Sequence, residues 1–122
     1  MCGIAGGVGR PAAERVRRMI ALTAYRGPDG QRFLERPEKG PRAVLGHARL
    51  SIVDLEQGWQ PLRDESGVTW VVANGEIYNH RELRAELEGR GHRFATGSDT
   101  EAALHLVEEA LDGAANTPAP AP

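Results

Sequence analysis

The stretch CGIAGGV at residues 2–8 decides how this chain is expected to fold. Its residues are small or apolar, which is typical of a buried strand, and its glycines let another backbone or a ligand approach closely. The single cysteine, Cys2, begins the stretch and directly follows Met1. Removal of Met1 would give one residue both a thiol nucleophile and a free α-amine, and an α-amine ordinarily titrates near neutral pH. A lone cysteine is more often an inert buried thiol, so its position alone does not assign it a catalytic role.

Helical and extended patterns alternate after this first strand. Apolar residues recur on one helical face after Pro11, which suits the first turn of a helix. The strand rich in β-branched and aromatic residues at 68–73 (VTWVVA) is the clearest in the chain. Shorter extended segments are predicted at residues 31–35, 43–47 and 50–53. Because strands and helices interleave, the sequence predicts a mixed α and β fold.

Two further helices are predicted after the turn signal at Asn74-Gly75. Asn79 followed by Glu82, and Ser98 followed by Glu101, resemble capping boxes that open helices. Apolar residues lie on one side of each helix. The second of these helices is predicted to end at Leu111.

The chain is predicted to divide into a domain at residues 1–111 and a disordered Ala- and Pro-rich tail at residues 112–122. With 15 basic and 17 acidic residues the net charge is −2, which gives no electrostatic reason to bind nucleic acid or an anionic membrane. The sequence shows no membrane span and no signal peptide. One cysteine allows no intrachain disulfide, and a cytoplasmic location is expected.

A cysteine that cleaves an amide needs hydrogen-bond donors for the oxyanion and groups that hold the substrate. Asn74 and Gly75 offer a side-chain amide and an unhindered backbone N–H. Arg49 could grip a carboxylate through two N–H groups, and Asp99 could accept from an ammonium. A site that binds both a carboxylate and an ammonium would recognise a free amino acid. A free amino acid that also carries a cleavable side-chain amide is glutamine. Taken singly, the same residues are more often a hairpin turn, a solvated arginine and a carboxylate at a helix dipole.

Six motifs strengthen the combination. They are MCGIAG (1–6), YRGPDG (25–30), GHARLSIVDL (46–55), QPL (60–62), NGEIYNH (74–80) and TGSDTE (96–101). In order and approximate spacing, from residue 1 to about 109, they resemble the class II glutamine amidotransferase domain of the asparagine synthetase family. Tyr25 stands where that family often has histidine.

The resemblance implies an α+β fold, the αββα sandwich of N-terminal-nucleophile (Ntn) hydrolases, incomplete at its C-terminus. Family members continue with further strands, and asparagine synthetases add an ATP-dependent synthetase domain. The chain is therefore expected to be a fragment, a stand-alone remnant that needs a partner, or an altered gene product.

The resemblance also implies roles for individual residues. Cys2 would be the nucleophile with its own α-amine as proton shuttle, and Asn74 and Gly75 would form the oxyanion hole. Arg49 would pair with the α-carboxylate of glutamine, and Asp99, helped by Glu76, would hold its α-ammonium. The other substrate-binding residues implied are Leu50, Ser51, Ile52 and Val53 along the pocket, and Arg26 near Cys2.

The implied substrate is L-glutamine, and the implied partner is a synthetase domain or subunit that receives ammonia. No cofactor is expected in this chain, because ATP and Mg would belong to the absent synthetase domain. The four histidines show no i, i+4 ligand spacing, so no metal site is expected. Two alternatives stay open: a non-catalytic module that binds glutamine or a partner, and an Ntn hydrolase for another amide, against which the amino-acid clamp argues.

Overall fold

The structure is a computed structural model that describes residues 1–36, 42–52 and 55–115. Its elements in chain order are β1 (Gly3–Val8), α1 (Ala12–Leu22), the short 3₁₀ helix η1 (Ala24–Arg26), β2 (Gly30–Arg36), β3 (Ala43–Arg49), β4 (Leu62–Arg63), β5 (Trp70–Val71), α2 (His80–Gly89) and α3 (Asp99–Ala115). This order confirms the prediction of a mixed α and β fold. Within the described ranges, no helix is long and apolar enough to cross a membrane.

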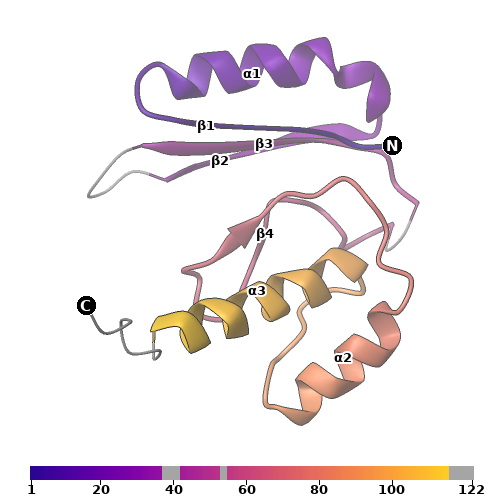
Figure 1. Cartoon of the computed structure of the whole chain (residues 1–122). Helices are drawn as coiled ribbons and strands as arrows, with labels where there is room; N and C mark the ends of the chain where they lie inside the picture. Colours follow the sequence, from indigo (N-terminus) through magenta and orange to yellow (C-terminus); the bar gives the residue numbers. More distant parts are fainter. Residues whose placement is uncertain (37–41, 53–54, 116–122) are drawn as a thin grey trace.

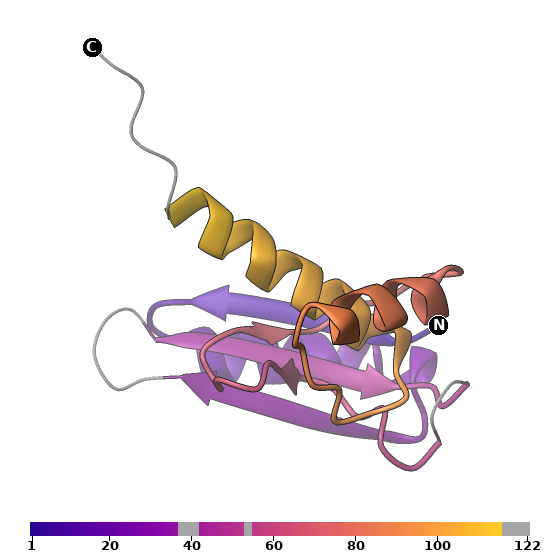
Figure 2. The ribbon, with the colours of Figure 1, turned by 90° about the horizontal axis from the view of Figure 1, so that it is seen from below.

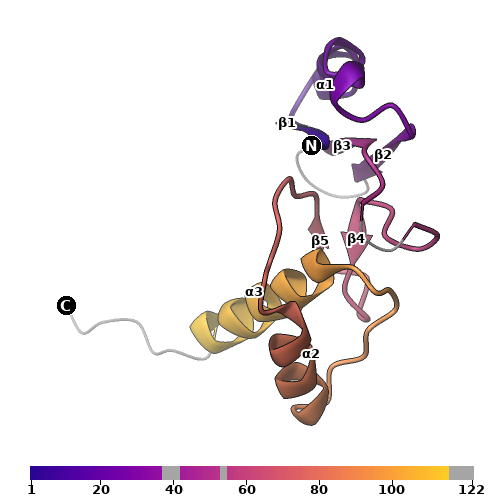
Figure 3. The same cartoon turned by 90° about the vertical axis from the view of Figure 1, so that its right-hand side faces the viewer.

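The elements are stacked in layers (Figures 1 and 3). Helix α1 covers one face of an antiparallel three-stranded sheet, in which β3 lies between β1 and β2. The small β4–β5 sheet, followed by α3 and α2, lies on the other side. Figure 2 shows α2 and α3 in front of the sheet, on the side away from α1. β1 is therefore an edge strand, and β3 pairs with both β1 and β2.

The apolar core lies between α1 and the sheet. Val16 and Ile20 of α1 pack with Val44 and Ala48 of β3, and all four are buried. A Cβ on Gly46, between those two strand residues, would stand 2.7 Å from Ile20 Cγ1. Glycine at this position therefore lets the helix approach the sheet closely, as the small residues of the first strand also do.

The opposite face of β3 is polar. His47 and Arg49 alternate with the core residues and so point away from α1, and they are only 1% and 2% exposed. A buried arginine and a buried histidine on a central strand need polar surroundings. They indicate that the space between the two sheets is not a second apolar core.

A loop from the YRGPDG motif is fastened to the end of β3. Asp29 N–H donates to Arg49 O at 2.9 Å, and Ser51 N–H donates to the Asp29 carboxylate at 2.7 Å. The backbone of Gly27 lies so close that a Cβ there would stand 2.1 Å from Ala48 O. The loop therefore fixes the residues that follow the strand.

The second half of the chain differs from expectation in the extent of its strands. Only Trp70–Val71 of the strand predicted at 68–73 joins a ladder, and its partner is Leu62–Arg63, where the sequence predicts no strand. The extended segment predicted at 50–53 is not a strand where it is described, and Val53 lies outside the described residues. Two-residue strands leave no periodic pattern for a sequence to reveal.

Both predicted capping boxes are wrong in detail. Asn79 precedes α2 as expected, but its side chain makes no capping hydrogen bond. Ser98 Oγ accepts from Thr100 N–H at 3.3 Å, as an N-cap does. The Glu101 carboxylate instead accepts the N–H groups of residues 95 and 96, at 2.6 and 2.8 Å.

The end of α3 is also corrected, since the helix continues past Leu111 to Ala115. Alanine is the strongest helix former, and two alanines follow Gly113, which costs only about 1 kcal/mol in a helix. Four residues predicted to belong to the tail are therefore helical, and residues 116–122 lie outside the described part of the chain.

Replacing Gly27 with alanine is expected to lower the free energy of unfolding by about 1–3 kcal/mol, because the new methyl group would collide with the backbone of Ala48. Urea denaturation followed by circular dichroism measures the change. Gly89→Ala is the matched control, since a Cβ there meets no atom within 4 Å. Equal stability of the two variants would show that the loop does not pack against the strand as described.

Candidate active site

A cavity of about 390 Å³ lies where several separate elements meet. Its walls come from the residues before β1, the end of β3, two loops at 58–60 and 73–78, and the first turn of α3. Its volume lies in the range of small-molecule sites. The predicted site residues that line it are Cys2, Arg49, Leu50, Ile52, Asn74, Gly75, Glu76 and Asp99.

Backbone groups orient the Cys2 sulfur. Leu50 N–H donates to Sγ at 3.3 Å, and Leu50 O lies 3.6 Å from the same sulfur as an acceptor for its proton. Arg26 Nε donates to Cys2 O at 3.5 Å, so this predicted site residue contacts Cys2 although it does not line the cavity. Met1 also lines the cavity. The thiol and the residue before it therefore face the same space.

The Arg49 guanidinium is held by an aromatic ring. Its Cζ lies 4.7 Å from the centroid of the Trp59 ring, and Arg32 stacks on that ring at 4.3 Å. Cation–π contact of this kind holds a desolvated arginine in one orientation. Of the two arginines, only Arg49 lines the cavity.

The segment that carries Asn74 and Gly75 is anchored at both ends. Before it, Ala73 N–H donates to the Gln60 side chain at 2.5 Å. After it, Ile77 N–H donates to Asp99 Oδ2 at 2.7 Å. Gln60 Nε2 also reaches the hydroxyl of Thr100, at 3.5 Å. The loop is thus positioned by two buried side chains rather than by sheet hydrogen bonds.

For two predicted pocket residues, Ser51 and Val53, the structure does not support a place in the cavity wall. Ser51 does not line it, because its N–H is bound to Asp29 and its position follows the loop at 25–30. Val53 lies outside the described residues. Their predicted roles remain expectations.

Several residues that line the cavity were not identified from the sequence as site residues. They are Met1, His47, Gly58, Gln60, Ala73, Tyr78, Ser98 and Thr100. The strand period of two could have found His47, which lies on the same face as Arg49. Gln60 belongs to the QPL motif, but nothing local shows that its amide would support the loop at 73–78.

Burial, reinforced by the positive charge of Arg49, lowers the pKa of His47 from 6.5 to about 4. Among the described residues, neither ring nitrogen of His47 has a hydrogen-bond partner. The imidazole is therefore neutral at pH 7, and a polar group of this cavity wall is available to a bound molecule.

The sequence of this chain is similar to those of known proteins. Residues 1–116 match the family model described as "Glutamine amidotransferase domain". "Asparagine synthetase [glutamine-hydrolyzing] 1" of Bacillus subtilis (strain 168) is 41% identical over 121 residues, covering 90% of this chain and 18% of the relative. The Arabidopsis thaliana protein of the same name is 39% identical over 114 residues, covering 89% and 18%. "Asparagine synthetase [glutamine-hydrolyzing]" of Zea mays is 41% identical over 114 residues, covering 89% and 18%. The chain thus spans less than a fifth of the length of these relatives.

The buried His47 is expected to make stability depend on pH. Its folded pKa of about 4 lies below the ordinary value of 6.5, so unfolding takes up a proton between these two values. This contribution to stability is fully present above pH 6.5 and is lost as pH falls toward 4. Urea denaturation at pH 7.5, 5.5 and 4.5 should show a steeper loss for the wild type than for His47→Gln. Parallel losses in the two proteins would contradict a neutral, buried His47.

Proposed function

The chain belongs to the glutamine amidotransferase domain family, and from this membership we propose that it hydrolyses L-glutamine to glutamate and ammonia with Cys2 as the nucleophile. The single observation that carries the proposal is the cavity in which Cys2, Arg49, Asn74, Gly75 and Asp99 meet. These residues come from the two ends of the described chain and from its middle. A fold that brings all five to one space supports a shared task.

The N-terminal amine is assigned the role of the base. Because Met1 and Cys2 both line the cavity, removal of Met1 would place the new α-amine of Cys2 at the cavity wall, on the same residue as the sulfur. A cysteine thiol normally needs a neighbouring base to become an efficient nucleophile. Met1 removal is therefore part of the proposed activity.

The substrate's backbone groups are assigned to charged side chains in the same wall. Arg49 would bind the α-carboxylate through its planar guanidinium, which is held in place by Trp59. Asp99 would accept from the α-ammonium, with Glu76 adding negative charge. One Asp99 oxygen holds Ile77 N–H, and the other oxygen is the one we assign to the substrate.

The reaction follows from these positions. The Cys2 sulfur attacks the side-chain carboxamide carbon, and the oxyanion accepts from the Asn74 amide and the Gly75 N–H. The α-ammonium of Cys2, having taken the thiol proton, gives a proton to the departing nitrogen, and ammonia leaves. Water then attacks the γ-glutamyl thioester, which releases glutamate and restores the thiol.

We also propose the αββα sandwich of Ntn hydrolases as the fold. The order of layers supports it: α1, the three-stranded sheet, the β4–β5 sheet, and then α3 with α2. The proposed glutaminase unit comprises residues 1–111, and α3 extends it to Ala115.

The names of the relatives support asparagine biosynthesis as the purpose of the ammonia. The proposed acceptor is a synthetase domain or subunit, which would also bind ATP and Mg. The proposed location is the cytoplasm.

Glutamate release from glutamine by the Met1-processed chain tests the proposal. We expect Cys2→Ala to abolish release. Asn74→Ala should lower kcat by about 10²–10³-fold, since one oxyanion donor is lost. Unchanged activity in Cys2→Ala would exclude the nucleophile. Glutamine binding by calorimetry without hydrolysis would instead favour a non-catalytic module.

The amino-acid clamp has an internal control in the two arginines that share Trp59. Arg49→Lys should raise KM for glutamine, because lysine cannot form the two-pronged contact with a carboxylate. Arg32→Lys, on the same ring but outside the cavity, should leave KM unchanged. Equal KM values for both variants would remove Arg49 from the substrate site.

A further inference from the structure

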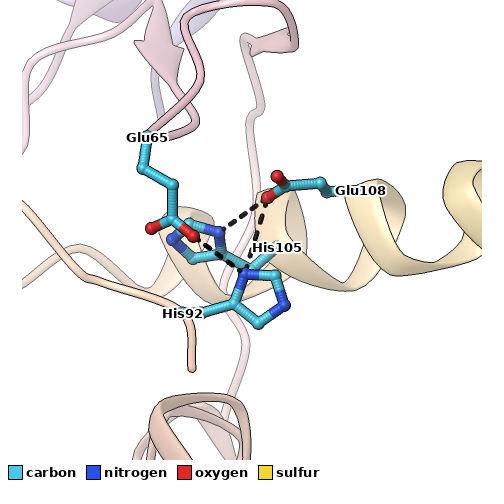
Figure 4. A group of neighbouring side chains, drawn as sticks. All are labelled: Glu65, His92, His105 and Glu108. Carbon is cyan, nitrogen blue, oxygen red and sulfur yellow. Dashed lines mark hydrogen bonds and ion pairs between the residues drawn. The ribbon is translucent and has the colours of Figure 1, made fainter. Parts of the chain in front are cut away.

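Two histidines and two glutamates converge on the side of the molecule that carries α2 and α3 (Figure 4). Glu65 lies in the turn between β4 and β5, His92 follows α2, and His105 and Glu108 lie one turn apart on α3. One ligand atom from each of the four lies within 4.8 Å of the others. None of these residues lines the cavity of the candidate active site.

Three of the six separations between the four side chains are close to those of ligands around a tetrahedral ion. His105 Nδ1 lies 3.1 Å from Glu108 Oε2, and His92 Nδ1 lies 3.5 Å from Glu65 Oε1 and 3.6 Å from Glu108 Oε2. Ligands bound tetrahedrally at the usual Zn–N and Zn–O lengths stand about 3.3–3.6 Å apart. The two longer separations are too long for good hydrogen bonds but suit ligands that share an ion.

Contacts behind the cluster orient two of the four side chains, His92 and Glu65, toward it. His92 Nε2 lies 3.2 Å from Glu109 Oε1, and a ring proton on this nitrogen would leave the Nδ1 lone pair to a metal ion. His105 Nε2 faces Glu101 Oε1 at 3.8 Å. Glu65 Oε2 accepts from Arg93 N–H at 2.7 Å, so its other oxygen is aimed at His92. Each ring thus has a carboxylate behind it.

Burial and charge also favour a cation. The His105 side chain is 0% exposed, and His92 Nδ1 is buried with no hydrogen-bond partner among the described residues. Two carboxylates converge on the two imidazole rings here, and a cation among them would compensate their negative charge. A divalent ion would neutralise both and would satisfy His92 Nδ1.

We propose that Glu65, His92, His105 and Glu108 bind a divalent transition-metal ion, Zn²⁺ by preference, in a closed structural site. Two imidazoles and two carboxylates suit Zn²⁺, whereas Mg²⁺ and Ca²⁺ prefer oxygen ligands alone. The ion joins the β4–β5 turn to α3 and to the loop after α2. This proposed site departs from the expectation that the chain has no metal site, because that expectation considered only the spacing of histidines along one helix. It does not depend on glutamine hydrolysis.

The test uses the full chain without an affinity tag and with Cys2→Ala, so that the thiol cannot bind metal. After equilibration with Zn²⁺ and removal of excess, metal analysis should give one Zn²⁺ per chain. Competition with a chromophoric chelator measures affinity. His92→Gln and Glu108→Gln should each weaken binding by at least the 10–100-fold that loss of a supporting residue costs. Co²⁺ in the same site should show the visible absorption of a four-coordinate ion.

Glu82→Gln, on an exposed face of α2, and His80→Gln are the matched controls and should leave affinity unchanged. Circular dichroism checks the fold of each variant. Glu65→Gln serves as the ligand variant that is expected to fold, because this side chain is 35% exposed in a turn and its replacement leaves the helices intact. Zn²⁺ binding below one per chain, or full affinity in the folded Glu65→Gln and Glu108→Gln chains, would overturn the site. The four residues would then form histidine–carboxylate pairs only.

Discussion

The alternation of side chains along β3 is the constraint on which the rest of the structure depends. One face of this strand carries Val44, Gly46 and Ala48, which let α1 pack closely and form the apolar core. The other face carries His47 and Arg49, buried in the wall of the cavity. Because β3 is central, its register with β1 fixes the position of Cys2, which directly precedes β1. Leu50, the residue after β3, then lies beside the Cys2 sulfur. A shift of one residue would bury the wrong face and separate the sulfur from the arginine.

Polar side chains do most of the positioning around the cavity. Asp29, Gln60 and Asp99 each accept a backbone N–H from a loop or chain segment that forms or borders the cavity. Gln60 and Asp99 are buried, where such bonds are costly to leave unmade, so the loop at 73–78 has one favoured position. Glu101 acts in the same way on the segment before α3. The arrangement makes the site rigid without requiring long strands in the second sheet.

The elements of the first half were predictable because each has a regular pattern. Small residues at 2–8 indicated the first strand, and the apolar face around Val16 and Ile20 indicated α1. Most of the cavity residues were placed by the family's motifs, not by periodicity. The two-residue strands β4 and β5 have too little length to show a period. Likewise, Glu101 has the position of a capping-box residue, and only the folded loop decides that it binds residues 95 and 96 instead.

The cluster of His92, His105, Glu65 and Glu108 was invisible for a different reason. Its members come from a turn, a loop and a helix, so no spacing within one element relates them. The central claim concerns the first residues of the chain, and its most direct test is mass spectrometry after treatment with a glutamine analogue whose carboxamide is replaced by an electrophilic ketone. We expect one adduct, on Cys2 of chains that lack Met1, and protection by excess glutamine. An adduct elsewhere, or equal labelling of chains that retain Met1, would contradict an N-terminal cysteine nucleophile in this cavity.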